Sequence, residues 1–312
     1  MDVFKTVCKR RATTQTTFLM GAVCLLTSFF LSGKAHASEE IILSTRDGER
    51  LAIVLPVGRG PQPTVLVLHG AMGTADLMVS RTSFDEVGRR HHFTIVFPEG
   101  LKRQWNDGRF HDPDRPDDVA FLRKLTHELI ERRIAKPGHI YIAGISNGAA
   151  MSFTMACRVG RLFRGIGTVI NSMPAGMRSC RLHSVPLVMV AGTADPLVPY
   201  AGGRVGFRRE RGKVLGMEET AQMFARKNGC RSRRTHALPD RDRTDGSTVT
   251  RVTWGQCRTG KPVTLYRVEG GGHQIPGGRT LMPLLLGRTN HDISAAEVIM
   301  KAFAREEARI SE

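Results

Sequence analysis

A serine between two glycines, placed directly after an apolar run, constrains this chain more than any other feature. The run His139–Ala143 has the composition of a buried strand, and Gly144-Ile145-Ser146-Asn147-Gly148 follows it without a gap. A sharp strand-to-helix turn cramps the backbone of its central serine, so side chains two positions away on either side would clash. Glycine fits both places, and the next helix would aim its N–H groups at developing negative charge. The pattern predicts a nucleophilic Ser146, with a chance glycine-bounded turn as the alternative.

Short apolar runs alternate with helix-like segments along the rest of the chain. A hairpin around Asp47-Gly48 is expected to open the fold. Helices are expected to begin at Ser83, in a capping-box sequence, and at Asp117. Further strands are predicted at 64–68, 93–97, 139–143, 165–170, 186–191 and 263–268, and further helices at 147–157, 217–227 and 294–309. This order predicts an α/β fold in a single domain, with a mostly parallel central sheet and helices on both faces.

The first 37 residues have the pattern of a targeting segment. A basic start precedes the apolar stretch Phe18–Leu31, and Ala35-His36-Ala37 is a small-x-small cleavage site. We interpret 1–37 as a secretory signal peptide and 38–312 as the exported domain, extracellular or periplasmic. An uncleaved anchor is the alternative, although the apolar stretch is short for a membrane span.

The charge of the chain favours anionic partners in general but not nucleic acid. The net charge is +17, and removing a segment with five basic residues and one acidic residue leaves +13. Such a surface attracts anionic polymers or surfaces. The basic residues are scattered, with clusters at Arg204–Lys213 and Arg231–Arg243, and no nucleic-acid-binding motif is present. The polar stretch 231–248 is interpreted as a mobile hairpin or excursion.

Four cysteines remain when the two in the first 37 residues are set aside. An even number in an exported protein indicates two disulfides, and four cysteines allow three pairings. We favour Cys157–Cys180 and Cys230–Cys257 because each pair closes a loop of fewer than thirty residues. Buried free thiols are the alternative. The cysteine spacing does not resemble a zinc site, so no metal is expected.

A nucleophilic Ser146 would need an acid and a base later in the chain, in the order Ser, Asp, His. Of the three late histidines, His273 follows a predicted strand and three glycines, which let an imidazole approach another backbone closely. His236 lies in the polar stretch and His291 just before the last helix, where solvated or capping roles suffice. We therefore predict His273 as the general base.

Asp195 is the predicted partner of that base. It follows the apolar run that ends at Ala191, and catalytic groups in such folds gather at the carboxyl ends of strands. A carboxylate there would accept the Nδ1–H of His273 and stabilise the imidazolium. A turn-forming role before Pro196 is compatible with this assignment. Other acids, less favoured because their segment is so polar, are Asp240, Asp242 and Asp245.

The segment after the first buried strand is the expected second half of an oxyanion hole. The backbone N–H of Asn147 would supply one donor and that of Ala71 or Met72 the other. His69 is expected to be structural rather than catalytic. The side chains that could line a substrate pocket are His69, Trp105 and Ile275, and a core or loop-packing role is the alternative for Trp105.

Several motifs in order along the chain resemble secreted esterases of the polyhydroxybutyrate-depolymerase-like and feruloyl-esterase-like family. The matching pieces are Leu68-His69-Gly70, Trp105-Asn106, Asp117-Asp118-Val119-x-Phe121, Gly144 to Ser152, Gly192-Thr193-x-Asp195-x-x-Val198-Pro199-Tyr200 and Gly270-Gly271-Gly272-His273-x-x-Pro276-Gly277-Gly278. The resemblance implies an α/β-hydrolase fold, a Ser146–Asp195–His273 triad, carboxylic ester hydrolysis and disulfides near the pairs named above. One departure is Ile275, where the family often has an aromatic residue.

These expectations converge on a secreted serine esterase that works through an acyl-enzyme without metal or cofactor. Its expected substrates are polyhydroxybutyrate-type oligomers or polymers, or feruloyl or acetyl esters, and no nucleic acid or stable membrane partner is expected. A secreted serine peptidase is the alternative, because the same serine motif serves amide bonds. A non-catalytic binding protein on the same scaffold is a third possibility, but it would be expected to have lost a member of the triad.

Overall fold

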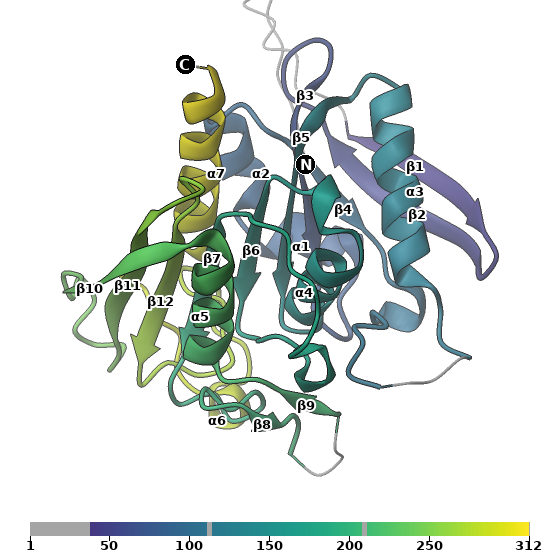
Figure 1. The fold of residues 1–312 in the computed structure, drawn as a ribbon. Coiled ribbons are helices and arrows are strands. Elements are labelled where there is room, and N and C mark those ends of the chain that lie inside the picture. Colours follow the sequence, from purple (N-terminus) through teal and green to yellow (C-terminus); the bar gives the residue numbers. More distant parts are fainter. Residues whose placement is uncertain (1–37, 111–113, 208–210, 312) are drawn as a thin grey trace, which may run out of the picture. The chain divides into compact units, whose positions relative to one another are not determined.

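A ten-stranded sheet forms the centre of the protein (Figure 1). The computed structural model describes residues 38–110, 114–207 and 211–311. The strands lie in the order β1-β2-β4-β3-β5-β6-β7-β12-β11-β10. Their bounds are β1 Glu39–Thr45, β2 Gly48–Leu55, β3 Gln62–Leu68, β4 Thr94–Pro98, β5 Ala135–Ile145, β6 Gly165–Val169, β7 Leu187–Gly192, β10 Cys230–Ala237, β11 Thr248–Cys257 and β12 Val263–Glu269. The two short strands β8 (Gly203–Arg204) and β9 (Lys213–Val214) form a separate pair.

The central six strands, from β4 to β12 in this order, are all parallel, and antiparallel strands flank them on both sides. Strands β1 and β2 form the predicted hairpin, with Thr45 paired to Gly48. At the other edge, β12, β11 and β10 run antiparallel to one another. The parallel core brings the carboxyl ends of β3, β5, β6, β7 and β12 to one edge of the sheet, which confirms the predicted mostly parallel arrangement.

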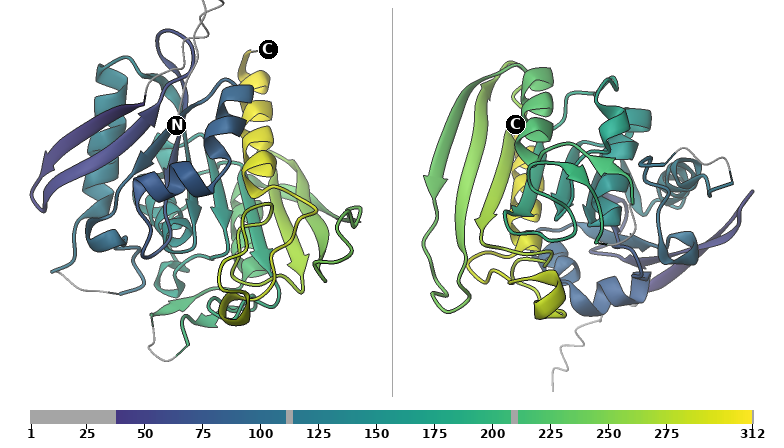
Figure 2. Two further views of the ribbon diagram at one scale, coloured as in Figure 1. Left: turned by 180° about the vertical axis from the view of Figure 1, so that it is seen from behind. Right: turned by 90° about the horizontal axis from the view of Figure 1, so that it is seen from below.

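Helices cover both faces of the sheet (Figure 2). Apolar side chains of α3, α4 and α5 pack into one core layer, and those of α1, α2 and α7 into a second layer. The helix bounds are α1 Ala75–Arg81, α2 Phe84–Arg90, α3 Asp118–Glu131, α4 Asn147–Val159, α5 Met217–Asn228, α6 Pro283–Leu286 and α7 Ala295–Ser311. Short 3-10 turns occupy Leu101–Arg103, Gly160–Leu162 and Ala175–Met177.

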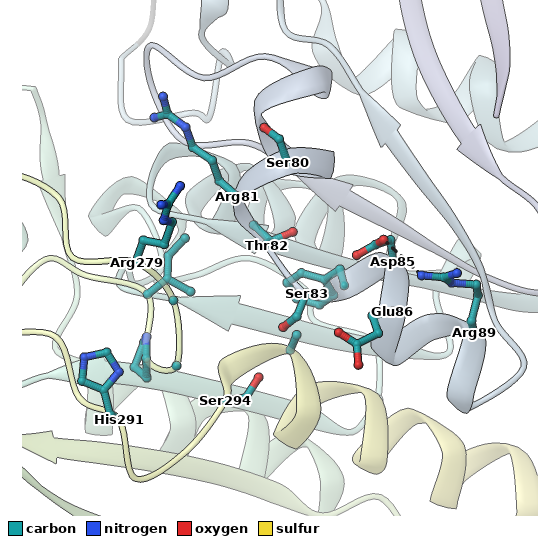
Figure 3. Close-up of a pocket in the computed structure, with 16 residues that line it drawn as sticks. Ser80, Arg81, Thr82, Ser83, Asp85, Glu86, Arg89, Arg279, His291 and Ser294 are labelled. Atoms are coloured by element: carbon teal, nitrogen blue, oxygen red, sulfur yellow. Dashed lines mark ion pairs between the residues drawn. The ribbon is translucent and has the colours of Figure 1, made fainter. Parts of the chain in front are cut away.

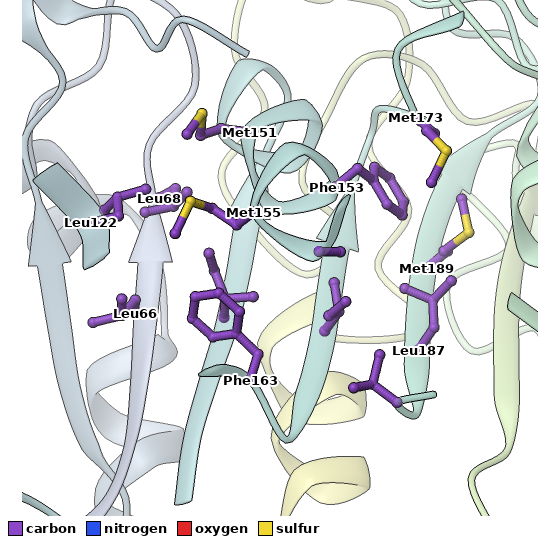
Figure 4. Close-up of a cluster of buried hydrophobic side chains, with 14 of the residues drawn as sticks. Leu66, Leu68, Leu122, Met151, Phe153, Met155, Phe163, Met173, Leu187 and Met189 are labelled. Atoms are coloured by element: carbon purple, nitrogen blue, oxygen red, sulfur yellow. The ribbon is translucent and has the colours of Figure 1, made fainter. Parts of the chain in front are cut away.

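The core beneath α4 holds the serine-bearing turn in place (Figure 4). Met151 and Phe153 of α4 are fully buried, and so are Leu66 and Leu68 of the neighbouring strand β3. Burying such side chains contributes about 1.5–3 kcal/mol each. Because α4 begins directly after Ser146, this packing fixes the direction in which the helix leaves the sheet.

Two local features differ from the sequence predictions. Helix α1 was not expected. Ser83 is the residue before α2, as predicted, but its side chain makes no capping hydrogen bond. The polar stretch 231–248 is part of a hairpin, one of the two interpretations given above: β10 is an edge strand paired with β11, and residues 238–247 form the loop between them. Its arginine-rich sequence suits an edge strand, because charged side chains there discourage pairing with other chains.

Both favoured cysteine pairs are disulfides in the structure. Cys157, near the end of α4, is bonded to Cys180, and Cys230 is bonded to Cys257 across the β10–β11 hairpin. The described residues include no helix long and apolar enough to span a membrane. The predicted signal peptide, residues 1–37, lies outside the described part of the chain.

Candidate active site

Ser146 occupies the strained turn that the sequence predicts, between β5 and α4. Its φ and ψ are 53° and −116°, a region that non-glycine residues rarely adopt. The Ser146 N–H donates to the carbonyl of Val169 at 2.8 Å, which ties the turn to β6. A Cβ on Gly144 would lie 2.2 Å from the Gly148 carbonyl oxygen, and a Cβ on Gly148 would lie 2.4 Å from that of Leu68. Both glycines are therefore required by close backbone contact.

Three side chains meet at the carboxyl edge of the sheet. Ser146 Oγ lies 2.9 Å from His273 Nε2, and His273 Nδ1 lies 2.7 Å from Asp195 Oδ2. The Asp195 side chain is 1 % exposed and that of His273 is 9 % exposed. Because the buried carboxylate accepts the Nδ1–H, Nε2 is left to accept the proton of the serine hydroxyl. This arrangement can activate Ser146 as a nucleophile.

Backbone contacts fix the acid and the base before any substrate binds. Asp195 Oδ1 accepts the N–H groups of Leu197 and Val198, each at 2.8 Å, which orients Oδ2 toward His273. The His273 N–H donates to the Leu286 carbonyl at 2.6 Å. A Cβ on Gly272 would lie 2.1 Å from that same oxygen. The glycine run before His273 therefore lets the chain pass close to α6.

Backbone amides near Ser146 form a candidate oxyanion hole. Asn147 is the first residue of α4, and its N–H makes no hydrogen bond within the described residues. The Met72 N–H is occupied, because it donates to the Arg103 carbonyl at 2.8 Å. The Ala71 N–H has no acceptor among the described residues, and Gly70 packs against the Ser146 side chain. Of the two donors predicted on this loop, only the Ala71 N–H is therefore available to an oxyanion, because the Met72 N–H already donates to a carbonyl.

The expectation that His69 and Trp105 could line a substrate pocket is wrong. Their exposures are 0 % and 1 %, so substrate cannot reach either side chain. His69 Nε2 accepts the Gly100 N–H at 2.9 Å, its Nδ1 lies 2.7 Å from the Gly70 carbonyl, and burial lowers its pKa. Trp105 Nε1 donates to the His69 carbonyl at 2.9 Å, and the two ring centres are 4.9 Å apart. Both residues hold the oxyanion loop in place, as expected for His69.

Sequence reasoning missed the polar cluster that supports this loop from the other side. The Asn147 side chain accepts the Trp105 N–H at 2.7 Å and donates to Asp107 at 2.5 Å. Asp107 is buried and also paired with Arg109 at 2.6 Å. Asn171 donates to the Ser146 carbonyl at 2.9 Å. The motif Trp105-Asn106 directly precedes Asp107 in the sequence, but it did not include Asp107 itself.

Ile275 is half-buried and lines a cavity of about 760 Å³ beside the site (Figure 3). The cavity lies among the end of α1, the start of α2, the segment 275–279 and the start of α7. Ser146, Asp195 and His273 do not line it. Ile275 therefore lines a cavity that the three reacting side chains do not line.

The sheet order, the two helical layers and the serine turn define an α/β-hydrolase fold. A solved structure, an acetyl xylan esterase from Aspergillus awamori, matches 77 % of this chain and 95 % of its own length, with a TM-score of 0.55 and 13 % identity. No family model matches the chain.

Two relatives of this chain carry the names of esterases. "Putative esterase NocK" from Nocardia uniformis subsp. tsuyamanensis is 29 % identical over 258 residues, which cover 79 % of this chain and 74 % of that protein. Feruloyl esterase D from Neurospora crassa is 25 % identical over 180 residues, 57 % of this chain and 52 % of that protein. The chain is thus similar to esterases of the feruloyl-esterase-like kind, as its motifs indicate.

Proposed function

We propose that the protein is a secreted serine esterase. His273 removes the proton of Ser146, whose oxygen attacks the ester carbonyl. The N–H groups of Asn147 and Ala71 donate to the oxyanion, and loss of one such donor typically costs about 3 kcal/mol of transition-state stabilisation. The alcohol leaves with the proton held by His273, and water then releases the acid from the acyl-enzyme.

One observation carries this proposal: the continuous hydrogen-bonded line from Ser146 through His273 to a buried Asp195, with distances of 2.9 and 2.7 Å. The line ends beside two amides that have no acceptor among the described residues. Such preorganised donors act where charge develops during acyl transfer. The esterase names of the relatives support carboxylic esters, rather than amides, as the substrate class.

We further propose that the ester substrates carry feruloyl or acetyl groups, or are oligomers or polymers of the polyhydroxybutyrate type. The first choice is supported by the names of a feruloyl esterase among the relatives and of an acetyl xylan esterase with the same fold. Export of residues 38–312 after cleavage of a signal peptide at residue 37 is also a proposal. Two disulfides support it, since such bonds persist mainly in oxidising compartments.

Ser146→Ala tests the proposal. We expect it to abolish hydrolysis of a short-chain nitrophenyl ester and labelling by a serine-directed fluorophosphonate, with an unchanged unfolding midpoint. Ser152→Ala is the matched control, because this buried hydroxyl lies in the helix that follows Ser146, and among the described residues it bonds only to the Gly148 carbonyl. Full ester hydrolysis by Ser146→Ala would overturn the mechanism. Hydrolysis of peptides in preference to esters by the native protein would assign it to the peptidases.

A further inference from the structure

The cavity beside the candidate active site has an uneven distribution of charge (Figure 3). Arg81, at the end of α1, and Arg279, on the segment after His273, lie at one end. Asp85, Glu86 and Arg89 of α2 lie at the other end. A ligand in this cavity therefore meets two guanidinium groups from two separate parts of the chain.

The acidic groups of the cavity are already paired with their own neighbours. Asp85 lies 3.5 Å from Arg89, and Glu86 lies 3.4 Å from Arg90, both across one helical turn. Arg81 and Arg279 form no ion pair with any carboxylate in the described residues. The positive charge at their end of the cavity is thus uncompensated by the protein.

Both walls of this cavity continue directly from segments of the candidate active site. Ile275, on one wall, is two residues beyond His273, and the Gly278 N–H donates to its carbonyl at 2.9 Å. The other wall contains Arg81, the last residue of α1. Helix α1 starts four residues after Ala71, and Arg81 ends it, about 9 Å along the helix axis from Ala75.

The segment that carries Arg279 is held by backbone contacts, and these contacts do not involve the Arg279 side chain. The Gly277 N–H donates to the Asn290 carbonyl at 2.8 Å. Gly277 has a φ of +77°, and a Cβ there would lie 2.7 Å from the Ile293 carbonyl oxygen. The segment after His273 is therefore packed tightly against the chain before α7, and Arg279 is exposed at its end.

From this geometry we propose that the cavity is an anion subsite, in which Arg81 and Arg279 bind a carboxylate carried by the ester substrate. The guanidinium fork matches carboxylate geometry, and two arginines from different elements can hold one acidic group between them. The subsite selects esters whose carboxylate is remote from the scissile carbonyl, because Ser146, Asp195 and His273 do not line this cavity. This inference rests on the proposed esterase function and adds to it a preference for acidic substrates.

The test compares a neutral ester with acidic esters that share its acyl group and add one carboxylate on spacers of increasing length. We expect native protein to have the higher kcat/KM for at least one acidic ester. Arg81→Gln or Arg279→Gln should lower that value about fivefold, and the double variant by about 10- to 25-fold, because exposed ion pairs contribute up to about 1 kcal/mol each. Values for the neutral ester should stay unchanged. Arg123→Gln, an exposed position on α3, is the charge-matched control.

Salt provides a second readout. Raising ionic strength from about 0.01 to 1 M shortens the Debye length from about 30 to 3 Å and should remove much of the preference for that acidic ester. Equal kcat/KM for the neutral ester and every acidic ester in the native protein, or an unchanged preference in the double variant, would overturn the subsite while leaving the esterase intact. Failure to hydrolyse any of these esters would instead refute the esterase proposal on which it rests.

Discussion

Replacing Asp195 by asparagine is the sharpest test of how His273 is oriented. Asp195 Oδ1 accepts two amides, those of Leu197 and Val198, at 2.8 Å. An asparagine must keep its own oxygen in that place, since a flipped side chain would point its NH₂ group at two N–H donors. The Nδ2 atom then faces His273 in place of Oδ2. Because Nδ2 donates, His273 Nδ1 must accept, and the ring proton moves to Nε2.

The wrong tautomer removes the general base. With Nε2 protonated, His273 can no longer accept the hydroxyl proton of Ser146 across their 2.9 Å contact. We expect kcat for a nitrophenyl ester to fall by about 10⁴, equivalent to about 5.4 kcal/mol in the activation free energy. The cost in stability should stay below about 1.5 kcal/mol, because the amide still bonds to Nδ1.

The assay is steady-state ester hydrolysis at pH 7 to 8, with urea unfolding to compare stability. Asp240→Asn is the control, because Asp240 is a rival acid from the sequence analysis and is exposed. We expect it to retain native activity. A kcat for Asp195→Asn within tenfold of the native value would show that the 2.7 Å contact between Asp195 and His273 does not set the tautomer.

Three further perturbations test the fold around the site. Gly148→Ala should destabilise the protein by about 1–3 kcal/mol in urea unfolding, because its Cβ would lie 2.4 Å from the Leu68 carbonyl oxygen. Asp118→Asn should cost about 3–5 kcal/mol in the same assay, because it leaves the buried Arg50 guanidinium, 2.6 Å away, without its countercharge. His69 has a lowered pKa in the folded state, so the unfolded chain binds more protons as pH falls below about 6.5. Its contribution to the free energy of unfolding should therefore decrease on acidification, by up to about 1.4 kcal/mol per pH unit, and His69→Gln should flatten this dependence in urea titrations between pH 7 and 5.5.

The two substitutions that test packing and charge each have a control. Gly176→Ala meets no atom within 4 Å and should leave stability unchanged. Asp85→Asn removes a half-buried partner of the exposed Arg89 and should cost less than about 1 kcal/mol. Equal losses in a variant and its control would contradict the steric or electrostatic reason given for that variant. A His69→Gln protein with the native pH dependence would contradict the assignment of that dependence to His69.

Features that depend on neighbours along the chain could be predicted. The apolar runs at 64–68 and 263–268 are strands, and Gly144 and Gly148 flank a strained serine, because local sterics and periodicity determine both. The opening hairpin followed from Asp47-Gly48 for the same reason. The arginine-rich stretch 231–248 was left open between a hairpin and an irregular excursion, because polarity alone does not distinguish an exposed edge strand from a loop.

Features that depend on distant segments required the tertiary structure. Sequence alone could not show that Trp105 packs against His69 in the core rather than lining a pocket, because both roles suit a tryptophan. Nor could it choose between Ala71 and Met72, since the acceptor that occupies the Met72 amide is the carbonyl of Arg103.

By itself, the sequence determined the class of fold, the strained turn at Ser146 and the candidates for its partners. The tertiary structure decided which of them meet. Ser146 and His273 are 127 residues apart in the chain, and His273 and Asp195 are 78 residues apart. Parallel strands bring their carboxyl ends to one edge of the sheet, so distant loops converge there. The packing of the whole domain then determines which atoms come within hydrogen-bonding distance. A local sequence pattern cannot specify a contact between residues so far apart in the chain.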